Sequence, residues 1–240
     1  MFLFDQQLFF GAIKNSIKYL PVTIIISFVP ILINFVLGTA LAFDEYCGSR
    51  RARRIRNFFT LYAKSVPAIL TLFLFYYLIY DLVAYLNKNC GFPIGVKDIS
   101  VLWVAVIALA FDGIGMYAET MRGAFLSVGR GQMEAGYSIG MDERQIFNRV
   151  LFPQIMVEAI INLRMNILSS ILFSSMVYSI GVMDMFNGST EYAIRFYAYK
   201  EAYLGCALVY WALCAVVSRV ILMVEKKIKK DNGVIIVQKG

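Results

Sequence analysis

Apolar residues in this chain gather into five long blocks separated by short polar stretches. The blocks cover about residues 20–43, 65–86, 99–118, 159–183 and 202–224. Each block is long enough to cross the roughly 30 Å hydrocarbon core of a bilayer as a helix. Lipid offers no partner to unpaired backbone groups, and the blocks lack the alternation typical of a membrane barrel. The pattern therefore predicts an all-α polytopic membrane protein with five transmembrane helices.

The first sixteen residues are also largely apolar, but they do not form an uninterrupted block. Asp5, Gln6 and Gln7 interrupt the stretch, and no small-residue cleavage site follows it. The block at 20–43 is also too long for the apolar part of a cleaved signal peptide. We expect residues 1–16 to form an amphipathic segment at the membrane interface, and residues 1–240 to form a single transmembrane domain.

Lysine and arginine are unevenly divided between the two sides that this pattern creates. Of 23 such residues, sixteen lie on one side, six lie on the other, and Arg164 lies within a span. The sixteen are found in residues 50–64, 122–149 and 219–239, and the six in residues 14–18, 88–97 and 195–200. Cytoplasmic loops carry the excess, so we expect the N-terminus outside and the C-terminus in the cytoplasm. The run from Arg50 to Arg56 either keeps this segment on the cytoplasmic side or binds anionic lipid.

The composition of the chain argues against several kinds of function. The net charge of +7 is compatible with nucleic-acid binding, but the basic residues lie in loops between apolar blocks. We interpret them as a topology signal and expect no nucleic-acid partner. The chain has no histidine, and its four cysteines lack metal-type spacing, so we expect no metal site. It also lacks the G-x-x-x-x-G-K-[ST] loop that holds ATP, so we expect neither enzyme activity nor a cofactor in this chain.

The polar stretch at about residues 121–153 is the most informative segment. It is predicted to form a short helix, a break at Gly140, and a second short helix that carries Arg144 and ends before Pro153. A small-residue turn lets a short helix protrude and fit a groove on a partner, and Glu134 can cap or orient that helix near its start. The segment is therefore either a docking surface for a soluble partner or a solvated surface loop.

The triplet Glu134-Ala135-Gly136, followed by Gly140 and then Pro153, resembles the E-A-A loop of ABC importer permeases. Before it, Tyr117-Ala118-Glu119 and Arg122-Gly123 resemble the A-Y-x-x-E-x-x-R-G pattern of polar amino-acid permeases. The resemblance implies contact with an ATPase for these residues: Gly131, Glu134, Ala135, Gly136, Gly140, Arg144 and Pro153. It also implies that the loop lies in the cytoplasm.

The resemblance implies a type I ABC importer permease fold in a bacterial inner membrane. The partners would be a dimer of ATP-binding subunits that holds ATP and Mg, a second permease subunit (identical or homologous), an external substrate-binding protein, and membrane lipid. The cargo would be a polar amino acid moved by alternating access. Cystine is one candidate, because Tyr210-Trp211 resembles the last span of cystine permeases.

The fourth span departs from the family. Relatives have a K-D-T-S-L run where this chain has residues 173–177, F-S-S-M-V. This departure motivates an alternative in which the chain is a non-substrate-binding partner in a heterodimeric permease. A stand-alone ion-coupled carrier is a further alternative, but five spans without an inverted repeat count against it.

Four polar residues within spans are candidates for substrate binding: Arg164, Asp112, Ser174 and Ser175. A charge inside a span costs roughly 2.5–3.5 kcal/mol, so Arg164 needs a partner. It either holds the carboxylate of an amino acid or pairs with Asp112 or another subunit. Asp112 either binds an ammonium group or neutralises Arg164. The serines either line a pathway or pack helices together.

Overall fold

We describe the fold from a computed structural model, in which residues 4–90 and 95–231 are placed. The elements in chain order are α1 (Gln6–Lys18), α2 (Leu20–Tyr46), α3 (Arg50–Ser65), α4 (Ala68–Cys90), η1 (Val96–Asp98), α5 (Val101–Ser127), α6 (Arg130–Ser138), α7 (Glu143–Ile146), η2 (Phe147–Leu151), α8 (Phe152–Phe173), η3 (Ser174–Ile180), α9 (Met185–Phe196) and α10 (Tyr199–Asp231). Within the placed residues there is no strand, and five helical segments are long and apolar enough to span a membrane. The all-α, five-span prediction is thereby confirmed.

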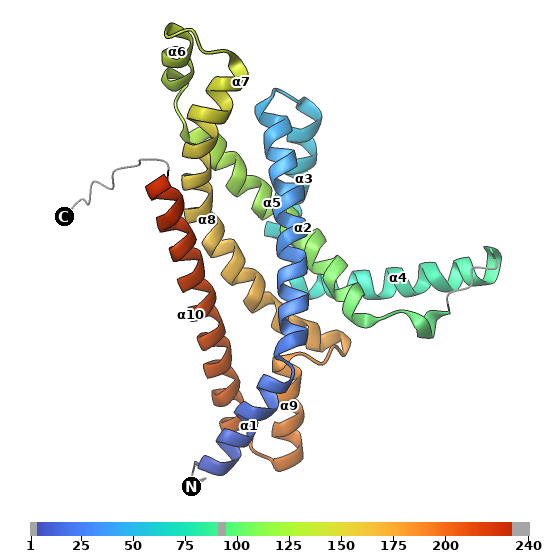
Figure 1. The fold of residues 1–240 in the computed structure, drawn as a ribbon. Coiled ribbons are helices and arrows are strands. Elements are labelled where there is room, and N and C mark those ends of the chain that lie inside the picture. The colour runs from blue at the N-terminus through green and yellow to red at the C-terminus, as the bar shows by residue number, and fades with distance from the viewer. Residues whose placement is uncertain (1–3, 91–94, 232–240) are drawn as a thin grey trace.

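The principal difference from the predicted elements lies at residues 50–65, which we expected to be a charged loop. They form α3, which folds back beside α2 (Figure 1). Ser49 caps the helix by accepting a hydrogen bond from the Ala52 amide at 3.1 Å. Ala52, Arg56 and Thr60 recur every four residues and are buried, so one face of α3 packs inward. The density of arginines in the sequence hides this helical period.

Helix α5 lies at the centre and packs against α2, α3, α4 and α8. Small residues permit this packing, because they let neighbouring backbones approach. A methyl group added to Gly115 would overlap the backbone of Phe59 and Thr60 in α3, and one added to Gly38 of α2 would lie 2.7 Å from the Ala118 amide. Thr60 also donates a hydrogen bond to the Gly115 carbonyl at 3.2 Å.

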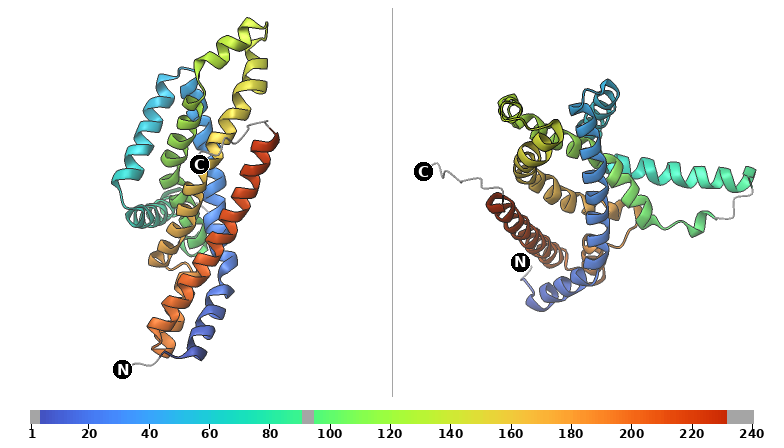
Figure 2. Two further views of the ribbon diagram at one scale, coloured as in Figure 1. Left: turned by 90° about the vertical axis from the view of Figure 1, so that its left-hand side faces the viewer. Right: turned by 45° about the horizontal axis from the view of Figure 1, so that its top comes forward.

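The bundle has two opposite ends. Helices α6 and α7 project at one end, and α1 and α9 lie at the other (Figures 1 and 2). The turn between α2 and α3 and the C-terminal end of α10 lie toward the α6–α7 end. Helix α4 leans away from the bundle. The three segments that carry most of the positive charge therefore share one end of the molecule.

A buried polar cluster joins α9 to the bundle at the other end. Asp184 caps α9 by accepting a hydrogen bond from the Asn187 amide at 2.8 Å, and its second carboxylate oxygen accepts one from the Tyr210 hydroxyl at 3.0 Å. The Met185 amide donates to Thr23 Oγ1 at 3.0 Å. These bonds tie the start of α9 to both α10 and α2.

We expect Gly115→Ala to destabilise the protein, because the new methyl group would overlap backbone that cannot move aside. Overpacking of this kind costs about 1–3 kcal/mol. Thermal unfolding in detergent measures the effect. Gly123→Ala on the same helix is the matched control, since a methyl group there meets nothing within 4 Å. Equal midpoints for the two variants would contradict the close α3–α5 packing.

We expect the stability of the wild type to fall relative to Asp184→Asn as pH rises from about 4 to about 8. Burial raises the pKa of Asp184 above its ordinary value. Stability from a group with a raised pKa is present below the unfolded pKa and is lost as pH rises through the folded pKa. Asparagine keeps the capping oxygen and does not titrate.

Thermal midpoints measured across this pH range test the Asp184 prediction. Asp44→Asn, at an exposed aspartate on α2, is the control, and its midpoint should follow the wild type at every pH. A constant difference between wild type and Asp184→Asn would show that the burial of this carboxylate has no consequence for stability.

Candidate functional site

The hairpin of α6 and α7 has the break at Gly140 that the sequence predicts, but its second arm does not end before Pro153, because α7, η2 and α8 follow one another without a gap from Glu143 to Phe173. Helix α6 ends before Gly140, whose φ of 81° is in the left-handed region that favours glycine. Asp142 then caps α7: its carboxylate accepts from the Gln145 amide at 2.8 Å, and the Gln145 side chain accepts from the Asp142 amide at 3.2 Å. Pro153 lies at the start of α8, directly after the π-helical segment η2.

Glu134 does not cap α6, contrary to the role suggested from the sequence. The N-cap is Gly129, and no side chain makes a capping bond there. Glu134 lies in the second turn and is exposed, as are Ala135 and Arg144. Tyr137 and Ile139 are 51% and 76% exposed beside them. The hairpin therefore presents a mixed apolar and charged surface, of the kind that packs on a protein partner.

The base of the hairpin is part of the protein core. Ile146, Leu151 and Ile155 are buried in one apolar cluster with Met121 and Phe125 of α5. Gly136 makes room for Ile146, because a methyl group at position 136 would lie 2.6 Å from Ile146 Cγ1. The base of the hairpin is therefore packed directly against α5 and the start of α8.

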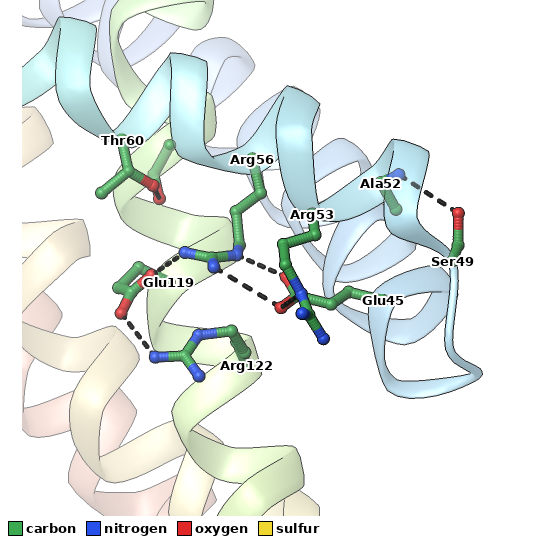
Figure 3. A network of polar contacts seen from close by, with 9 residues as sticks. Glu45, Ser49, Ala52, Arg53, Arg56, Thr60, Glu119 and Arg122 are labelled. Atoms are coloured by element: carbon green, nitrogen blue, oxygen red, sulfur yellow. Dashed lines mark hydrogen bonds and ion pairs between the residues drawn. The ribbon is translucent and has the colours of Figure 1, made fainter.

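An ion-pair network lies next to this base and joins α2, α3 and α5 (Figure 3). Arg56 of α3 donates to Glu45 of α2, with Nε 2.5 Å from Oε2, and to Glu119 of α5. Arg122 donates to Glu119 at 2.9 Å. Arg53 also contacts Glu45, at 3.3 Å. We refer to these five residues as the ionic cluster.

A cavity of about 550 Å³ lies between α2, the C-terminal end of α3, α4, α5 and α8. The polar residues of its lining are Ser27, Lys64, Ser65, Asp112, Tyr117, Asn166, Ser169 and Ser170. Among the lining residues that the structure places, Asp112 is the single carboxylate and Lys64 the single cation. The rest of the wall is mainly apolar. A cavity of this kind suits a small solute with one charge of each sign.

Hydrogen bonds orient the polar groups around this cavity. Thr71 donates to Asp112 Oδ1 at 3.4 Å and shares a hydrogen bond with the Tyr62 hydroxyl at 3.1 Å. The Asn166 side chain donates to Thr120 Oγ1 at 2.8 Å. The Ser27 hydroxyl is buried and has no hydrogen-bond partner among the placed residues. It is a polar group available to a solute.

The four candidate substrate residues do not share one site. Asp112 lines the cavity, whereas Arg164 is half-buried on α8 and is not among the lining residues. No ion pair between Arg164 and Asp112 occurs in the placed part of the chain. Ser174 is buried and donates to the Ile171 carbonyl at 2.7 Å. Ser175 lines a separate cavity of about 320 Å³ between α8, α9 and α10.

Of the polar residues that line the cavity, Asp112 was predicted from the sequence as a candidate for substrate binding. Lys64 and Ser27 carried no such signal, because one ends a charged segment and the other lies in an apolar block. Their positions become informative only when α2 and the end of α3 pack beside α5.

Comparison with known proteins agrees with this architecture. Residues 19–230 match the model of a protein family described as the binding-protein-dependent transport system inner membrane component. The chain is 29% identical over 229 residues to the L-cystine transport system permease protein TcyL of Bacillus subtilis (strain 168), covering 95% of this chain and 93% of that protein. It is 30% identical over 232 residues to the L-cystine transport system permease protein TcyB of the same organism, covering 94% and 90%.

The fold is also similar to a solved structure, the crystal structure of an amino acid ABC transporter with histidines. The TM-score is 0.76 at 21% identity, over 95% of this chain and all of that one. At this level of identity the likeness concerns the fold alone. It extends over the whole bundle rather than over one pair of helices.

Proposed function

The chain belongs to the family of binding-protein-dependent transport system inner membrane components, and from this premise we propose that it is the permease subunit of an ABC importer for a polar amino acid. As a member of this family it is a multi-pass protein of the inner membrane. The observation that carries the proposal is the connection of the hairpin to the cavity. Helices α5 and α8 lead into and out of the hairpin, and the same two helices supply Asp112 and Asn166 to the cavity wall.

The hairpin would dock on a separate ATP-binding subunit that holds ATP and Mg. The proposed contact residues remain Gly131, Glu134, Ala135, Gly136, Gly140, Arg144 and Pro153. Of these, Glu134, Ala135 and Arg144 are exposed and can touch a partner directly, whereas Gly136 and Gly140 maintain the shape of the hairpin. Closure of two ATPase subunits would move the hairpins of two permease subunits, identical or homologous, as rigid bodies.

The orientation of the chain is part of this proposal. The basic α2–α3 turn, the hairpin and the C-terminal end of α10 lie toward one end of the bundle (Figures 1 and 2). We assign this end to the cytoplasm, since the cytoplasmic side attracts lysine and arginine. The end formed by α1 and α9 would then face outward, where a binding protein delivers the solute.

The cavity supports an amino acid as the solute. A zwitterion needs a carboxylate for its ammonium group and a cation for its carboxylate, and Asp112 and Lys64 provide one of each. Hydroxyl and amide groups of Ser27, Ser170 and Asn166 can bind further polar atoms. Cystine is the first solute to test, because the relatives TcyL and TcyB are named as L-cystine permeases. Arg164, Ser174 and Ser175 stay candidates only if a second subunit brings them toward the path.

We expect an ATP-binding subunit to co-purify with the full chain in mild detergent, and Glu134→Lys to lower its recovery about tenfold. Reversal of an exposed charge at the centre of a docking surface typically costs this much or more. Mass spectrometry of the purified complex identifies the ATPase and any second permease. Failure to recover an ATPase with the wild type would refute the proposal and favour a stand-alone carrier.

Asp44→Lys is the matched control for the co-purification. It reverses an exposed acidic residue at the same end of the molecule but outside the hairpin, so the ATPase should be retained. Loss of the ATPase in both variants would indicate general disruption rather than a docking contact at Glu134.

We expect Asp112→Asn to lower cystine uptake in cells by about tenfold or more, because the ammonium group of the solute loses its charged partner. ATPase co-purification should not change. Asp81→Asn, at an exposed aspartate on α4, is the control and should transport normally. Unchanged uptake by Asp112→Asn would favour the alternative in which a second permease subunit holds the solute.

A further inference from the structure

Four of the five arginines of α3 fall into two sets. Arg53 and Arg56 turn toward α2 and α5, where they contact Glu45 in the ionic cluster (Figure 3). Arg51 and Arg54 are exposed, and neither makes an ion pair or a hydrogen bond within the placed part of the chain. Packing of the helix therefore accounts for the first set and leaves the second without a role.

Arg51 and Arg54 begin a stripe that continues along the same face of α3. The next residues at helical spacing are Phe58 and Leu61, which are 57% and 68% exposed. We call Arg51, Arg54, Phe58 and Leu61 the outer stripe of α3. Its polar half lies at the end of the helix next to the α2–α3 turn. Its apolar half lies about 10 Å further along, toward the middle of the bundle.

We propose that the outer stripe binds an anionic phospholipid, with Arg51 and Arg54 on the headgroup phosphate and Phe58 and Leu61 along an acyl chain. Guanidinium groups match the phosphodiester in charge and in geometry. Arginines that lie one to two turns above exposed apolar residues have the arrangement found at the boundary of headgroups and hydrocarbon.

The apolar half of the stripe argues against a soluble acidic partner. Such a partner would contact the arginines but leave Phe58 and Leu61 without cover. A role in setting the membrane orientation also does not explain the outer stripe by itself. Orientation depends on positive charge on the cytoplasmic side, and it does not require that the charged residues align with apolar ones. An anionic lipid is the occupant that uses both halves.

A lipid bound at the outer stripe would act on the packing of α3. The opposite face of this helix carries Arg56 and Thr60, which bind Glu119 and the Gly115 carbonyl of α5. The end of α3 supplies Lys64 to the cavity. The lipid would therefore hold α3 between the bilayer and α5. The inference does not depend on the proposed transport function.

The test uses tryptophan fluorescence in vesicles. The chain has two tryptophans, and a protein with Trp103→Phe, Trp211→Phe and Phe58→Trp carries a single reporter on the outer stripe. Quenching is compared between brominated phosphatidylglycerol and brominated phosphatidylcholine. We expect the anionic lipid to be favoured about fivefold or more at this position, and the preference to decline as salt is added.

Two variants and one second reporter complete the experiment. The double variant Arg51→Gln, Arg54→Gln should reduce the preference for the anionic lipid at position 58 to about onefold. The control double variant Lys226→Gln, Lys227→Gln removes the same amount of charge from the C-terminal end of α10 and should leave this preference unchanged. Native Trp211, 71% exposed on α10 and kept as the single tryptophan, should show no preference. Equal quenching by the two lipids at position 58, or a preference that survives loss of both arginines, would overturn the proposal.

Discussion

Helix α5 contacts α2, α3, α4 and α8 along its length because glycine and alanine residues allow their backbones to approach it. Water does not drive helices together inside a bilayer, so close van der Waals contact and buried hydrogen bonds must do so. Every functional feature of the chain depends on this packing. The cavity lies between α5 and its neighbours, the ionic cluster joins α5 to α2 and α3, and the hairpin continues directly from its end.

The ionic cluster lies between the hairpin and the cavity. Glu119 is two helical turns from Asp112 on α5, and Arg122 follows it toward the hairpin. Arg56 lies between two glutamates and is largely buried, so removal of either partner would leave a charge poorly solvated. Helix α3 is therefore tied to the part of α5 that the hairpin would move. The ionic cluster and the continuous helix α5 thus join the hairpin to the cavity wall.

Hydrophobic period and turn chemistry were sufficient to predict the spans and the hairpin, because both are local in sequence. Gly140 specifies the break in the hairpin through its left-handed backbone, and Asp142 specifies the start of α7 through its capping side chain. Helix α3 was missed because its arginines serve different faces, and composition does not distinguish them. The cavity could not be predicted, since Ser27, Lys64, Asp112 and Asn166 come from distant parts of the chain. Arg164 was a candidate for substrate binding because a charge within a span costs free energy, but that cost does not indicate which surface of the helix the side chain faces.

The contact between Gly136 and Ile146 bears on the exchange of coupling loops between permeases. The second alanine of the E-A-A triplet is glycine here, and the space it leaves is filled by Ile146 from the other arm of the hairpin. A chimera that takes only the first arm from a relative would combine alanine with isoleucine and force the arms apart. The two positions form one packing unit, so a graft of the hairpin should carry both arms together.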